Sequence, residues 1–147
     1  MKPFDKYPND GVSILQRQTE TNARHGYGLQ LQKLTGQSEC AYCGVDLISD
    51  YYRWLLLSVD HVIPLSECKR LGIPEDWAKS YSNMVISCLG CNWLDNRYEI
   101  QGHELKRTWA LEQFFVLRNA VFNERKQRIQ ESRMKELQFY NSHPWIS

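Results

Sequence analysis

Hydrophobic and polar positions divide the chain into helical ends around a short β segment. Apolar residues recur with helical spacing from about Val12 to Leu34, and Gly26 and Gly28 within this stretch predict a break or two shorter helices. Two short apolar runs, Trp54–Val59 and Asn83–Ser87, are rich in residues typical of strands and predict a pair of them.

Helices are expected around and after these strands. Pro64 ends the first strand, and Pro74 suits a helix start within the segment from Ser66 to Ser80, which predicts one or two short helices. Another short helix is expected from about Asn92 to Ile100, directly after the second strand. The order is therefore strand, strand, helix.

The C-terminal part predicts one long helix or two joined end to end, because no Gly or Pro occurs from Glu104 to Tyr140. Its apolar positions form one stripe that is wider in the first half, which we expect to pack on the rest of the protein while the charged second half projects. These positions are Leu111, Phe114, Phe115, Leu117, Val121, Phe122 and Ile129. We predict an α+β fold in a single domain spanning residues 1–147, with a core at about 38–100 and a C-terminal helical extension at about 104–140.

Composition favours a globular intracellular protein. The chain has 147 residues, 42% hydrophobic and 24% charged, and a formal net charge of +1. No run of 18 apolar residues or apolar leader is present, so we expect no membrane contact and a cytoplasmic, reducing location. Residues 104–140 contain eight Lys/Arg against five Asp/Glu. This excess is weak evidence for nucleic-acid binding, since a solvated helix face explains it equally well.

Four of the five cysteines form two close pairs, Cys40/Cys43 and Cys88/Cys91. A two-residue gap lets both thiolates of a pair turn toward one ion, so the two pairs predict a tetrahedral zinc site. The alternative is that the four cysteines are packing thiols that bind no metal. The fifth cysteine, Cys68, is expected to be a packing residue.

The 44 residues between Cys43 and Cys88 contain the adjacent pair Asp60-His61, and Asn92 directly follows the second cysteine pair. Such a pair alone is more often a surface turn than a catalytic dyad. Held in place by zinc, however, a carboxylate beside an imidazole suits metal-assisted hydrolysis. Adjacent residues of a regular strand point to opposite faces, so both serve one site only if the strand ends or bends there.

The combination of Cys40-Ala-Tyr-Cys43, Val59-Asp60-His61-Val-Ile-Pro64, Ser82-Asn83-Met-Val and Cys88-Leu-Gly-Cys91-Asn92 resembles the four-cysteine branch of the HNH, or ββα-metal, endonucleases. The motif maps onto His61, Asn83 and Asn92, which makes this an HNN version. The zinc would be structural.

Each site residue then has an expected role. His61 would be the general base, because a neutral imidazole accepts a proton near neutral pH. Asp60 and Asn92 offer hard oxygen ligands for a catalytic magnesium or manganese ion. The resemblance implies that Asn83 orients the loop that holds the base. Arg97 is the cation available near the position where relatives often carry Lys, and we expect it to contact phosphate.

The expected activity is hydrolysis of a DNA phosphodiester bond, with affinity dominated by contacts to the phosphate backbone. An RNA nuclease and a non-catalytic zinc module that binds nucleic acid or protein are the alternatives. One such site cuts one strand at a time, so cutting both strands would call for an arrangement such as a homodimer.

Overall fold

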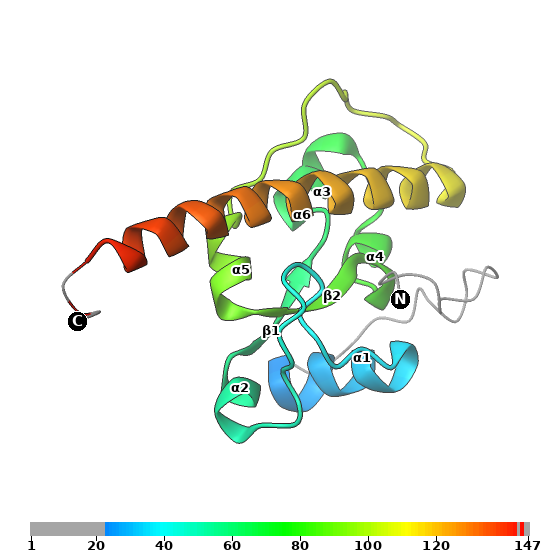
Figure 1. Cartoon of the computed structure of the whole chain (residues 1–147). Helices are drawn as coiled ribbons and strands as arrows, with labels where there is room; N and C mark the ends of the chain where they lie inside the picture. Colours follow the sequence, from blue (N-terminus) through cyan, green and yellow to red (C-terminus); the bar gives the residue numbers. More distant parts are fainter. Residues whose placement is uncertain (1–22, 144, 146–147) are drawn as a thin grey trace.

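The computed structural model describes residues 23–143 and 145 and has an α+β fold, in which a two-stranded hairpin is followed directly by a helix (Figure 1). Strands β1 (Leu57–His61) and β2 (Met84–Cys88) pair antiparallel, with Leu57 opposite Cys88 and His61 opposite Met84. Helix α5 (Leu89–Leu94) starts where β2 ends. This unit is the predicted strand, strand, helix order.

The first strand differs from the expected Trp54–Val59. Trp54 lies in a short helix, α2 (Tyr51–Leu55), and β1 begins only at Leu57. The reason is local: the Asp50 side chain caps this helix by accepting hydrogen bonds from the backbone N–H groups of Tyr52 and Arg53. Asp60 and His61 both lie within the strand, opposite Val85 and Met84, so β1 ends only after His61.

Short helices fill the connection between the strands. Helices α3 (Leu65–Leu71) and α4 (Glu75–Ala78) confirm the expectation for residues 66–80, with Pro74 immediately before α4. The 3-10 turn η2 (Tyr81–Asn83) takes Asn83 out of the second strand, which begins at Met84.

The N-terminal helix is described only from residue 23, so residues 12–22 of the expected helix lie outside the described part. From there the chain is a π-helical turn, η1 (Ala23–Tyr27), continuous with α1 (Gly28–Thr35). Gly26 and Gly28 widen the helix rather than break it. Both are buried, and this turn packs beside β1.

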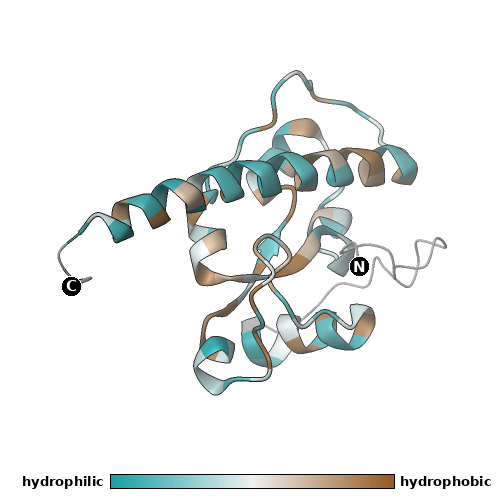
Figure 2. Cartoon of the chain, viewed as in Figure 1, coloured by the Kyte–Doolittle hydropathy of each residue, from teal (hydrophilic) through white to brown (hydrophobic). Residues whose placement is uncertain are grey.

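The long helix α6 (Leu111–Asn141) crosses the hairpin and α5 (Figure 1), and residues 104–110, expected to be helical, precede it as irregular chain. Hydrophobic and hydrophilic residues alternate along it (Figure 2). Its buried positions are Phe114, Leu117, Arg118, Val121, Phe122, Arg125 and Ile129. No residue of the helix beyond Ile129 is buried, which confirms that the second half projects.

One hydrophobic core extends from Leu31 of α1 through both strands to Ile129 of α6. Cys68 is buried in it, and its thiol donates to the carbonyl oxygen of Ile63 at 3.6 Å. Burial raises the pKa of Cys68 to about 12, so this thiol is an inert packing group. Among the described residues, no helix combines the length and apolar character needed to cross a membrane.

Candidate metal centre and active site

Cys40, Cys43, Cys88 and Cys91 form a cluster that could hold a metal ion. Their sulfur atoms all lie within 4.8 Å of one another, and the Sγ atoms of Cys43 and Cys88 are 3.8 Å apart. A tetrahedral zinc with bonds of about 2.3 Å places its sulfur ligands roughly 3.8 Å apart. Both the donor set and its spacing therefore fit zinc.

Local backbone geometry builds the two halves of this cluster. After Cys40 the chain turns sharply: the Gly44 N–H donates to the Cys40 carbonyl at 2.9 Å, and Gly44 has a φ of 78°, which favours glycine. Cys88 is both the last residue of β2 and the N-cap of α5, where its sulfur accepts from the Cys91 N–H at 3.4 Å. The cluster thus ties the start of α5 to the segment between α1 and α2.

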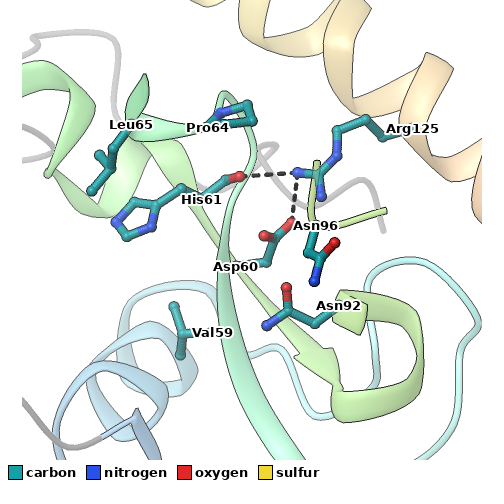
Figure 3. Close-up of a pocket in the computed structure, with 8 residues that line it drawn as sticks. All are labelled: Val59, Asp60, His61, Pro64, Leu65, Asn92, Asn96 and Arg125. Atoms are coloured by element: carbon teal, nitrogen blue, oxygen red, sulfur yellow. Dashed lines mark hydrogen bonds and ion pairs between the residues drawn. The ribbon is translucent and has the colours of Figure 1, made fainter. Parts of the chain in front are cut away.

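A pocket of about 280 Å³ lies beside the end of β1. Its walls combine three predicted site residues with residues that the sequence did not indicate (Figure 3). The lining residues are Val59, Asp60, His61, Pro64, Leu65, Asn92, Asn96 and Arg125. The structure therefore brings Asp60, His61 and Asn92 to one site, while Asn83 and Arg97 do not line it.

Asp60 is buried and held from one side. Its Oδ2 atom accepts hydrogen bonds from the Tyr42 hydroxyl at 2.5 Å and from Nη1 of Arg125 at 2.7 Å. Among the described residues, none donates to Oδ1. One carboxylate oxygen is consequently fixed and the other remains available to a ligand.

Asn92 reaches the pocket from the fourth residue of α5. We expected it at the helix start, but α5 begins three residues earlier because Cys88 caps it. The Asn92 amide nitrogen donates to the Ser58 hydroxyl at 3.3 Å. This contact turns the amide oxygen toward Asp60 (Figure 3). A carboxylate oxygen and an amide oxygen are hard donors, so this pair fits magnesium.

His61 is the last residue of β1, half-buried, with its ring on the other side of the strand from the Asp60 carboxylate (Figure 3). Burial lowers its pKa below the usual 6.5; Asp60 opposes this shift, and Lys79 and Arg125 add to it. The imidazole is therefore mostly neutral at pH 7 and able to accept a proton.

Asn83 lies beneath the loop that follows His61 and is fully buried. Its Oδ1 accepts from the Ile63 N–H at 3.0 Å, and its Nδ2 donates to the carbonyl oxygens of Ile63 at 2.9 Å and Ala78 at 3.0 Å. Its own carbonyl accepts from the Val62 N–H at 2.8 Å. These bonds tie the chain just beyond His61 to η2.

Arg97 is exposed, outside the pocket, and its phosphate contact stays a prediction. The cation in the pocket is Arg125, which the sequence reasoning missed. A signal was present: Arg125 interrupts the apolar stripe of α6 between Phe122 and Ile129. A charged residue on a buried helix face indicates a partner of opposite charge.

Comparison with known proteins gives one match. Residues 40–96 match the family model described as HNH endonuclease. No curated protein and no solved structure matches the chain.

Proposed function

We propose, on the premise that residues 40–96 match the HNH endonuclease family model, that the protein is a metal-dependent DNA endonuclease, which hydrolyses phosphodiester bonds. The observation that carries the proposal is the meeting of Asp60, His61 and Asn92 in one pocket beside the cysteine cluster. A zinc module that only binds nucleic acid or protein has no need to gather a carboxylate, a neutral imidazole and an amide.

In the proposed mechanism Asp60 and the three HNN residues have different roles. His61 accepts a proton from the water that attacks phosphorus, a role supported by its lowered pKa. Asp60 and Asn92 would hold a magnesium or manganese ion, and the chemistry it would supply is stabilisation of negative charge on the departing oxygen. Asn83 acts at a distance: its bonds to Ile63 fix the loop that follows His61 and so the position of the imidazole.

Zinc held by the four cysteines has a structural role in this proposal. Cys88 and Cys91 lie at the junction of β2 and α5, and α5 carries Asn92, so a bound ion would fix the distance between the hairpin and the helix. We also infer that the whole chain works as one domain, because a single core joins α1, the hairpin and α6.

DNA is the proposed substrate. RNA is the second candidate, because it contains the same kind of phosphodiester bond. We propose backbone contacts as the main source of affinity, with Arg97 among them, since it is an exposed cation just after α5. A homodimer would allow both strands to be cut.

The test is a nicking assay on supercoiled plasmid with Mg²⁺, with structured RNA as a parallel substrate. Wild-type protein should nick the plasmid, whereas Asp60→Ala and His61→Ala should be inactive yet keep their zinc, since neither residue is among the four cysteines. His103→Ala, which replaces an exposed histidine outside the pocket, is the matched control and should keep wild-type rates. Cleavage of RNA alone would redirect the proposal to RNA, and wild-type rates in His61→Ala would refute the general-base assignment.

A further inference from the structure

Arg125 lies in helix α6, outside the residues that match the family model, yet its guanidinium reaches the pocket. The side chain is 1% exposed. Burying a guanidinium among apolar residues costs stability unless every N–H and the charge find partners, so its surroundings indicate what it does there.

The Nη1 atom of the guanidinium donates hydrogen bonds to the end of β1 and the residue after it. This nitrogen donates to Asp60 Oδ2 at 2.7 Å and to the carbonyl oxygens of His61 and Val62, each at 2.9 Å. One nitrogen thus contacts the carboxylate and the backbone of the residues at the pocket. Movement of Arg125 would release both.

The other two nitrogens donate hydrogen bonds to Asp95, at the end of α5. Nε donates to Asp95 Oδ2 at 3.3 Å, and Nη2 donates to the Asp95 carbonyl oxygen at 3.2 Å. Arg125 therefore links the two elements that carry Asp60 and Asn92. The rigid planar fork of arginine suits this use, whereas a lysine could make only part of the set.

The contacts at Asp60 are one-sided. Tyr42 and Arg125 both donate to Oδ2, whereas Oδ1 receives no hydrogen bond from the described residues and points away from Arg125 (Figure 3). Two donors on the same oxygen fix the rotation of the carboxylate.

We propose that Arg125 is a positioning residue, which holds Asp60 through Oδ2 so that Oδ1 alone is presented to the catalytic ion, and which fixes the spacing between Asp60 and Asn92. This inference rests on the proposed nuclease function. It assigns to α6 a part in the active site that residues 40–96 do not supply.

Arg125 also has an electrostatic effect opposite to its positioning effect. Its positive charge beside Asp60 opposes the binding of a divalent cation. Without it, the carboxylate is more attractive to the ion but free to rotate, so the ion should bind at least as tightly while cleavage is slower. A residue that served only the fold would not separate these two properties.

The experiment compares Arg125→Gln with Arg128→Gln as the matched control. Arg128 is one helical turn away and pairs with the other oxygen of Asp95 at 3.0 Å, but its side chain is 50% exposed, and no contact with Asp60 is found among the described residues. Nicking is measured at saturating Mg²⁺. Binding of Mn²⁺ to zinc-loaded protein is measured separately by electron paramagnetic resonance, without DNA.

For Arg125→Gln we expect nicking to fall about 10- to 100-fold, the usual range for a residue that orients a metal ligand, with unchanged zinc content and a Mn²⁺ Kd equal to or lower than that of wild type. Arg128→Gln should keep both properties. Asp60→Asn should lose nicking and weaken Mn²⁺ binding. If Arg125→Gln does not fold, Tyr42→Phe, which removes one donor and keeps the ring, takes its place with an expected loss of about tenfold.

Unchanged nicking in the folded variant would overturn the inference, and so would Mn²⁺ binding that weakens in step with the loss of nicking. Failure of the proposed nuclease function can be distinguished from failure of this inference, because the wild-type protein itself would then cleave no DNA.

Discussion

Replacement of Asn83 by alanine should destabilise the protein strongly, because this fully buried amide makes three hydrogen bonds to the backbone. Removing it leaves the Ile63 N–H and the Ala78 carbonyl without their bonds to the Asn83 side chain; the Ile63 carbonyl keeps the weak thiol donor of Cys68 at 3.6 Å. Each buried polar group left unpaired costs about 1–3 kcal/mol. The total for these two groups is about 2–6 kcal/mol, a large part of the roughly 5–15 kcal/mol that stabilises a typical domain.

Thermal unfolding of zinc-loaded protein measures this effect. For a chain of this length the expected fall in Tm is roughly 5–20 °C. Asn83→Asp keeps the acceptor for the Ile63 N–H but loses both donors, so its Tm should also fall. Asn123→Ala, at an exposed position of α6, is the control and should change stability by no more than about 0.5 kcal/mol. A Tm within two or three degrees of wild type for Asn83→Ala would refute the positioning role of this side chain.

The nicking rate should also fall when the Asn83 side chain no longer holds the loop that follows His61. At a temperature where Asn83→Ala is folded, its nicking rate should fall by a similar factor with magnesium, manganese and cobalt, because the variant disturbs the base rather than a metal ligand. A loss confined to one metal would contradict this assignment.

Three further predictions concern the metal centres and the base. Cys43→Ser should lower zinc content and Tm together in elemental analysis and thermal unfolding, whereas Cys68→Ala, outside the cluster, should keep about one zinc per chain. Because burial lowers the pKa of His61, nicking should rise with pH along a limb whose midpoint lies below about 6.5 and level off near neutrality; a midpoint above 7 would contradict the burial argument. Asn92→His should keep activity with a shift toward softer divalent ions, whereas Asn92→Ala should lose most of it; equal losses with every metal would show that Asn92 holds no ion.

Short-range patterns in the sequence were enough to predict the cysteine cluster and the strand, strand, helix order. The spacing within each cysteine pair is local, and two such pairs leave few arrangements in space. Boundaries were less well predicted where a side chain caps a helix. Asp50 starts α2 inside the expected first strand, and Cys88 starts α5 before Asn92.

The partner of Asp60 could not be predicted, because it lies 65 residues away along the chain. Helical periodicity placed position 125 on the buried face of α6 but gave no register for that helix against the hairpin. The packing of Phe122 on Tyr42, with ring centroids 5.4 Å apart, is one contact that sets this register. Only then does Arg125 meet Asp60 and Asp95.

The face of α6 toward the hairpin carries arginines at intervals of two turns, and this arrangement bears on whether the residues that match the family model could be moved into another protein. Arg118 donates to the Ser82 carbonyl at 2.7 Å, Arg125 to the two aspartates, and Arg133 to the Cys91 sulfur at 3.5 Å. Residues 40–96 alone would therefore carry buried carboxylates and the Cys91 sulfur without the cations that contact them. A transplant of those residues into another scaffold would need either α6 itself or a substitute cation at the position of Arg125, so the unit that can be moved is longer than the recognisable motif.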